Sequence, residues 1–119
     1  METWDLTTID APAGTRDPVV LETADGARAV LIALAPGQEL GDHEVRERAW
    51  ITVVEGRARI ASDRGDAVEG GVGTLATFAP GERRSVSSEE GARILLLLAP
   101  WPGAGHYGAE ELRKLSADA

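Results

Sequence analysis

One segment of the chain decides the fold, and it reads Gly37-Gln-Glu-Leu-Gly-Asp-His43-Glu-Val45-Arg-Glu47-Arg-Ala49-Trp-Ile51-Thr-Val-Val-Glu-Gly56. The apolar run over residues 49–54 predicts a strand, because β-branched and aromatic residues favour an extended backbone. Gly56 predicts the turn that ends this strand, since glycine readily adopts the positive φ that tight turns need.

A second segment with a related layout follows residues 57–72, and it reads Gly73-Thr-Leu-Ala-Thr-Phe-Ala79-Pro80-Gly81-Glu82-Arg-Arg84-Ser-Val-Ser-Ser88. The two segments resemble the two sequence motifs of the cupin superfamily, usually written G-x5-H-x-H-x3-E-x6-G and G-x5-P-x-G-x2-H-x3-N. Every spacing fits, and the resemblance covers about residues 19–100. In the second segment, Ala79, Arg84 and Ser88 replace the proline, histidine and asparagine of the motif.

The resemblance implies an all-β fold, the cupin-type jelly-roll barrel or double-stranded β-helix, with about six to eight strands. Residues 1–119 then form a single domain, with the motif-bearing core at 19–100 and a tail at 101–119. The close spacing of 14 glycines and 6 prolines independently indicates an all-β domain. The strands predicted from apolar stretches between turn signals are 18–22, 27–35, 49–54, 57–62, 73–79, 85–86 and 92–99. In the tail, residues 109–115 fit either a short C-terminal helix or a frayed end.

The usual metal site of the family is incomplete in this sequence. The resemblance implies that His43, Val45, Ala49 and Arg84 point into the barrel, at the positions that normally hold a divalent metal. Valine and alanine side chains carry no lone pair, and Arg84 brings a permanent positive charge to the place of a cation. We therefore expect neither a metal nor another cofactor.

A rebuilt metal site is the alternative. Glu47 shares a pleat face with His43 if this segment stays a regular strand. His106 from the tail would then complete a 2-His-1-carboxylate set of the kind that holds non-haem iron. Glu44 and Glu82 are further candidate ligands.

Without the metal, the motif positions predict a ligand pocket instead. Its predicted lining consists of His43, Val45, Glu47, Ala49, Ile51 and Arg84. Arg84 offers a planar fork of donors, which suits a carboxylate or a phosphate group. His43, the one candidate catalytic residue, fits a hydrogen-bond partner or a general base near neutral pH. Alternatively, Arg84 pairs with Glu47 or Glu82 at the barrel rim, and His43 is a satisfied polar residue.

Three functions are compatible with these residues. The first is a cupin that binds or senses a small organic molecule, with carboxylate-bearing molecules included, in a mainly apolar barrel lined by Ile51, Val53, Ala58 and Ile60. The second is an enzyme, either a metal-free isomerase, cyclase or lyase with His43 as the base, or a metal enzyme through the rebuilt site. The third is a dimerisation module without a ligand. We favour the first.

Composition excludes several partners. Twelve basic and 20 acidic residues give a formal net charge of −8, which argues against nucleic-acid binding. The chain has no cysteine, and its longest apolar run, over residues 94–99, is too short to cross a bilayer. The acidic start lacks the pattern of a signal peptide. We expect a cytoplasmic protein that does not bind membranes.

The strand at 92–99 is apolar on both faces, so its outer face needs a cover. Either the N-terminal segment or a second copy of the chain can supply this cover. Trp50 needs a cover as well, because it points away from the face that carries Ala49 and Ile51. We expect a homodimer. After this strand, Trp101 and Tyr107 are expected to cap the open end of the sandwich, with a lid over the pocket as the alternative.

Overall fold

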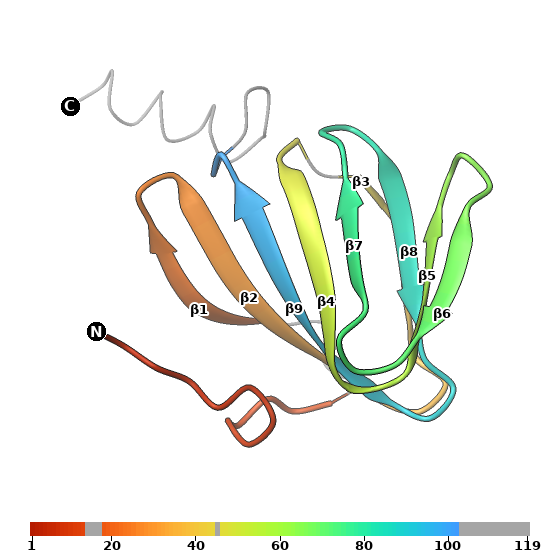
Figure 1. Cartoon of the computed structure of the whole chain (residues 1–119), viewed down its shortest axis with the longest axis horizontal. Helices are drawn as coiled ribbons and strands as arrows, with labels where there is room; N and C mark the ends of the chain where they lie inside the picture. The colour runs from red at the N-terminus through yellow and green to blue at the C-terminus, as the bar shows by residue number, and fades with distance from the viewer. Residues whose placement is uncertain (14–17, 45, 103–119) are drawn as a thin grey trace.

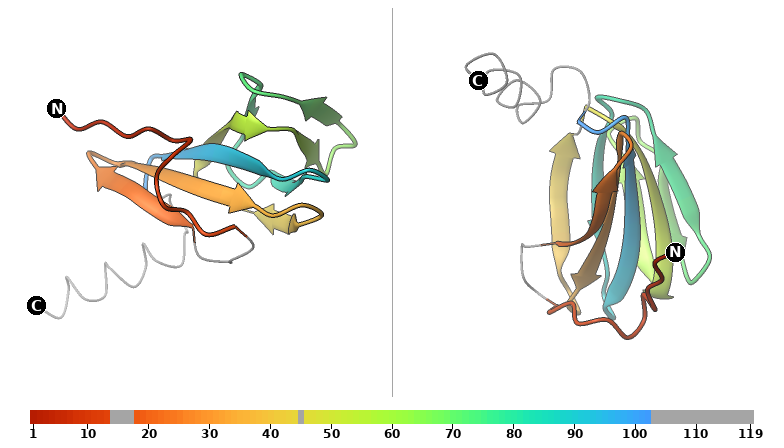
Figure 2. Two further views of the ribbon diagram at one scale, coloured as in Figure 1. Left: turned by 90° about the horizontal axis from the view of Figure 1, so that it is seen from below. Right: turned by 90° about the vertical axis from the view of Figure 1, so that its left-hand side faces the viewer.

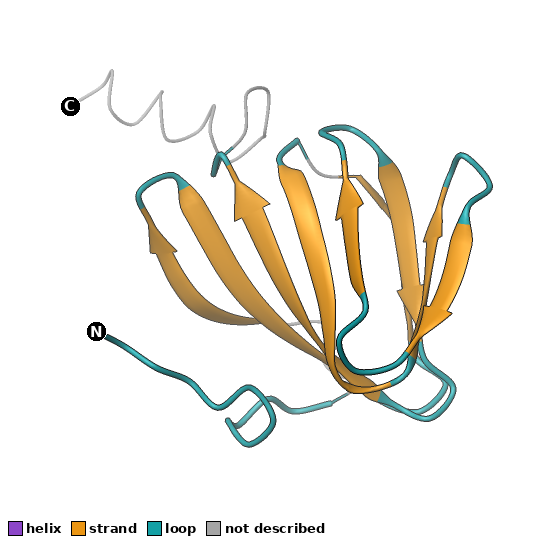
Figure 3. Ribbon diagram, in the orientation of Figure 1, coloured by secondary structure: helices purple, strands orange, loops and turns teal. Residues whose placement is uncertain are grey.

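The computed structural model describes residues 1–13, 18–44 and 46–102, and for residues 41–44 it describes the backbone alone. These residues form strands, loops and turns (Figure 3). Nine strands lie in this part of the chain: β1 (Val19–Ala24), β2 (Ala27–Leu34), β3 (Glu39–Glu44), β4 (Arg48–Gly56), β5 (Ala58–Ser62), β6 (Ala67–Gly70), β7 (Leu75–Phe78), β8 (Arg83–Ser87) and β9 (Ala92–Ala99). None of the described residues belongs to a helix that is long and apolar enough to cross a membrane.

The strands form two antiparallel sheets around a shared interior (Figures 1 and 2). The five-stranded sheet has the order β1-β2-β9-β4-β7, and the four-stranded sheet has the order β3-β8-β5-β6. The chain leaves the first sheet after β2, adds β3 to the second sheet and returns with β4. This exchange of strands between two sheets is the jelly-roll arrangement, which confirms the predicted all-β barrel.

Two of the strands were not predicted by the apolar pattern. β3 reads Glu-Leu-Gly-Asp-His-Glu, and a strand with this many polar residues lacks an alternating apolar signal. β6 has only four residues, Ala-Val-Glu-Gly, and three of them are exposed. The described part of the barrel therefore has nine strands, and the expected six to eight was wrong.

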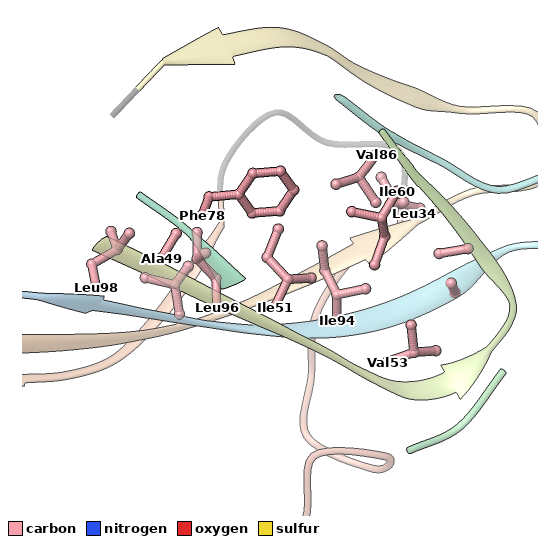
Figure 4. Packing of buried hydrophobic residues seen from close by; sticks show 13 residues of the cluster. Leu34, Ala49, Ile51, Val53, Ile60, Phe78, Val86, Ile94, Leu96 and Leu98 are labelled. Atoms are coloured by element: carbon pink, nitrogen blue, oxygen red, sulfur yellow. The ribbon is translucent and has the colours of Figure 1, made fainter. Parts of the chain in front are cut away.

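The main core lies between the two sheets and follows the alternation of β4 (Figure 4). Ala49, Ile51 and Val53 are fully or almost fully buried, whereas the intervening Trp50 and Thr52 are half-buried on the other face. This period of two is expected for a strand with one face against a core. The other sheet contributes Ala58, Ile60 and Val86 to the same cluster.

A second, smaller cluster covers part of the outer face of the five-stranded sheet. The N-terminal residues Leu6, Ile9 and Ala11 pack there against Leu31 and Ala33 of β2. The side chain of Arg93 on β9 ties down the segment, because its Nη1 donates to the carbonyl oxygens of Leu6 (3.0 Å) and Ile9 (2.9 Å). The N-terminal segment is thus one cover of the outer apolar face.

Gly56 ends β4 as the sequence predicts. Its φ is +77°, in the left-handed region that favours glycine, and β5 begins two residues later. A Cβ at this position would overlap the carbonyl oxygen of Gly91 in the loop before β9. Gly56 is therefore required both by its backbone angle and by the close approach of a neighbouring loop.

Candidate functional site

Two buried charged side chains lie at one end of the barrel, which we term the mouth and which lies at the top of Figure 1. Strands β2, β4 and β8 begin there, and β5, β7 and β9 end there. On the four-stranded sheet, Arg84 lies in register with Ser62. On the five-stranded sheet, Ala49 lies in register with both Phe78 and Leu98.

Glu47 and Arg84 are the only charged side chains among the described residues that are buried, with 0% and 6% of their surface exposed. Glu47 lies in the bend between β3 and β4, and Arg84 is the second residue of β8. Burial lowers the pKa of the Arg84 guanidinium, and the negative charge of Glu47 opposes this shift. The two charges therefore act on each other across the mouth, in an interior where ionic interactions are stronger than in water.

The guanidinium of Arg84 is not fully satisfied within the described part of the chain. Its Nη1 is buried and finds no hydrogen-bond acceptor there. A buried donor without an acceptor costs about 1–3 kcal/mol. Such a group is suited to receive an acceptor from outside the protein.

Glu82, the other carboxylate offered to Arg84 by the sequence, is engaged elsewhere. Its Oε1 accepts a hydrogen bond from the backbone N of Ala79 (3.0 Å), and its Oε2 accepts one from the Ser62 hydroxyl (2.8 Å). These hydrogen bonds lower the pKa of Glu82. Glu82 thus holds the turn between β7 and β8 at the rim, and Glu47 is the carboxylate that acts on Arg84.

The remaining predicted site residues fall into two groups. Ala49 and Ile51 are buried on the inner face of β4, and the backbone of His43 on β3 pairs with that of Arg84. Val45 and His106 lie outside the described residues.

The geometric condition for the rebuilt metal site is not met. β3 ends at Glu44, the chain bends at residues 46–47, and β4 belongs to the opposite sheet. Glu47 is therefore not on one regular strand with His43, which is the condition under which the two would share a pleat face. The described residues contain no group of three His, Asp or Glu that could hold a metal ion.

The lower interior of the barrel is filled with side chains. The inward residues Ile51, Val53 and Ile60 pack against other core residues (Figure 4), and Ala58 belongs to the same cluster. An open cleft of about 200 Å³ remains beside the mouth, with Ile60, Ala76 and Phe78 among its apolar lining residues and Ser62 and Glu82 at its polar rim. Arg84 and Glu47 do not line this cleft.

One residue of the mouth was missed from the sequence. Arg28 of β2 lies in register with Leu98, on the inner face that also carries Val30. Its guanidinium carbon stands 4.5 Å from the centre of the Trp101 ring, and its buried Nε has no hydrogen-bond acceptor among the described residues. The signal was available, since Arg28 lies two residues before Val30 and so shares its pleat face.

Solved structures with the same architecture come from several bacteria. A conserved protein with a double-stranded β-helix domain from Klebsiella pneumoniae has a TM-score of 0.74 and 21% identity, over 88% of this chain and 94% of that chain. An RmlC-like cupin from Desulfovibrio desulfuricans has a TM-score of 0.71 and 17% identity, over 84% and 97%. A cupin superfamily protein from Desulfitobacterium hafniense has a TM-score of 0.70 and 14% identity, over 79% and 85%. This chain has the cupin fold.

The resemblance of the two motifs to those of cupins is thus confirmed by the structure. No protein-family model matches the sequence, and no curated protein is significantly similar to it. At these identities the cupin fold is shown, and the fold does not name an activity. The function has to be argued from the residues at the mouth of this cupin barrel.

Proposed function

We propose that this chain is a binding or sensing protein for a small organic molecule with a carboxylate group. In this proposal, the carboxylate enters the mouth and accepts hydrogen bonds from Arg84. The buried Nη1 of Arg84, which has no acceptor in the described part of the chain, is the observation that carries the proposal.

The electrostatics of the mouth support an anionic ligand. Arginine binds carboxylates with two parallel hydrogen bonds, and these bonds are stronger where water is excluded. Glu47 already balances part of the charge of Arg84, so the ligand would share the guanidinium with it. The apolar side chains of Phe78 and Leu98 in the same part of the barrel suit the carbon skeleton of such a ligand.

Binding of the monocarboxylates acetate, propionate and butyrate tests the proposal, measured by NMR titration of the purified protein. Replacement of Arg84 by Met should weaken binding by about tenfold to a hundredfold, because a charge-assisted hydrogen bond contributes about 1.5–3 kcal/mol. The double variant E47Q/R84M provides a form without the isolated carboxylate that Arg84→Met leaves behind. The matched control is Arg59→Met, since Arg59 is exposed on the four-stranded sheet.

Three results would contradict the proposal. Wild-type protein that binds no monocarboxylate would refute the ligand class. Undiminished binding by E47Q/R84M would remove Arg84 from the site. An equal loss of affinity in Arg59→Met would mean that binding depends only on the net charge of the protein.

A further inference from the structure

Arg28 is a second cationic group at the mouth, in the opposite sheet to Arg84. Both arginines lie on inner pleat faces, since Arg28 is in register with the buried Leu98 and Arg84 is itself buried. Each also has a buried nitrogen without an acceptor in the described part of the chain, Nε in Arg28 and Nη1 in Arg84. Two independent strands thus direct unsatisfied donors toward one end of the barrel.

Arg28 is held in place by an aromatic ring. The Trp101 ring lies 4.5 Å from the guanidinium carbon, within the range of a cation–π contact. Trp101 is itself fixed, because its backbone N donates to the carbonyl oxygen of Gly26 (2.7 Å) and its side chain packs against the main core. A ring contact uses the face of a guanidinium and leaves the N–H groups at its edge available. The ring contact therefore orients Arg28 without using its Nε donor.

The described part of the mouth carries two arginines on inner faces and one buried carboxylate. Among the described residues, Glu47 is the only buried carboxylate, and it acts on Arg84. Arg28 contacts the ring of Trp101, and no second buried carboxylate lies among the described residues. A second anion would satisfy the Nε of Arg28 in the same way that the first satisfies Arg84.

We propose that the ligand is a small dicarboxylate, with one carboxylate on Arg84 and the other on Arg28. This inference rests on the proposed function, because it assigns the second half of the same ligand. Arg28 then determines specificity: it distinguishes a dicarboxylate from a monocarboxylate of equal length. Trp101 is a positioning residue, since it acts through Arg28.

Matched pairs of acids test the inference, with butyrate and succinate as the central pair. The two have the same number of carbons and differ only in whether one end is a methyl or a carboxylate group. Pairs with shorter and longer chains, from malonate to adipate, determine the spacing that fits best. The readout is the ratio of the two dissociation constants within a pair, because a general loss of folding affects both acids equally.

We expect wild-type protein to bind the best dicarboxylate at least tenfold more tightly than its matched monocarboxylate. Arg28→Met should reduce this ratio to about one and leave the monocarboxylate affinity within about twofold of wild type. Arg28→Lys keeps a charge but lacks the planar fork, and should recover only part of the ratio. Arg84→Met, by contrast, should weaken the binding of both acids.

The outcomes separate this inference from the proposed function. If wild-type protein binds monocarboxylates through Arg84 but shows no preference for any dicarboxylate, the inference fails and the proposed function stands. A preference that persists in Arg28→Met also overturns the inference. If neither class of acid binds, the proposed function fails and the inference with it.

Discussion

The interaction between Glu47 and Arg84 makes each residue dependent on the other. Both are buried, and removal of one charge leaves the other in an environment of low polarity. Loss of one partner of a buried pair typically costs about 3–5 kcal/mol, whereas replacement of both partners by neutral groups costs much less. Stability at the mouth therefore depends on charge balance more than on either side chain.

We predict that Glu47→Gln lowers the free energy of unfolding by about 3–5 kcal/mol. The double variant E47Q/R84M should recover a large part of this loss, because the uncompensated guanidinium is gone. Urea unfolding followed by circular dichroism measures both values. A double variant as unstable as the sum of the two single variants would show that the two charges are not coupled.

Glu82 predicts a pH dependence at the rim. The backbone N of Ala79 and the Ser62 hydroxyl lower its pKa below the ordinary value of 4.5, so the folded state favours the ionised carboxylate. The resulting stabilisation is present above pH 4.5 and is lost as pH falls through the lower folded-state pKa.

The difference in unfolding free energy between wild type and Glu82→Gln should therefore shrink as the pH is lowered through this range. Ser62→Ala should raise the pKa of Glu82 toward its ordinary value, which an NMR titration measures directly. Glu90→Gln, in an exposed loop, serves as the control. A pH-independent difference for Glu82→Gln would contradict the assignment.

At the scale of elements, a comparison of Gly56 with Gly81 separates the cost of a left-handed backbone from the cost of a steric overlap. Gly56 and Gly81 have almost the same φ, +77° and +81°, but only Gly56 faces a neighbouring loop, and a Cβ at Gly81 would meet nothing within 4 Å. Gly81→Ala should cost about 1–2 kcal/mol, the usual penalty for a left-handed conformation. Gly56→Ala should cost a further 1–3 kcal/mol or so, because the Gly91 loop must move.

Thermal or urea unfolding of the two alanine variants gives the comparison. Equal losses would mean that the approach of the Gly91 loop has no energetic consequence. A larger loss in Gly81→Ala would contradict the packing argument altogether.

The strands that the sequence predicts are those in which packing governs the pattern. β4 alternates buried and half-buried residues, and β9 presents Ile94, Leu96 and Leu98 to the core, so hydrophobicity alone identifies them. β3 and β6 depend on pairing with β8 and β5, a contribution of neighbouring strands that the local sequence does not carry. The local sequence does not show the break between β3 and β4 either. The buried position of Glu47 in this bend could therefore not be predicted.

The residues of the candidate site also differ in whether the local sequence or the tertiary structure identifies them. Motif spacing drew attention to Arg84, whereas the charge that acts on it comes from Glu47, which is buried in the bend between β3 and β4. Arg28 is far from both motifs in the sequence and reaches the mouth only through the pairing of β2 with β9.

At the scale of the whole molecule, one apolar face is incompletely covered by the residues that the structure describes. The N-terminal segment packs against Leu31 and Ala33, whereas Leu97 on β9 is still 40% exposed and lies in register with the half-buried Trp50 of β4. Because flat apolar patches of this kind are common in interfaces between identical subunits, we propose that two copies associate through them.

Leu97→Glu should then convert a dimer into a monomer, measured by sedimentation velocity. Val72→Glu is the control, since Val72 is 71% exposed in a loop outside this face. A wild-type monomer at micromolar concentration would refute the proposal, as would a dimer that survives Leu97→Glu.

The two arginines of the mouth also have a kinetic consequence, because they lie within a chain whose formal net charge is −8. A dicarboxylate approaching from a distance meets overall repulsion, and it meets attraction only once it is close to the guanidinium groups. Dissolved salt screens charges beyond about 8 Å at physiological ionic strength, so it removes the repulsion before it removes the attraction. Moderate salt should therefore speed the capture of such an anion, the reverse of its usual effect on the encounter of oppositely charged molecules.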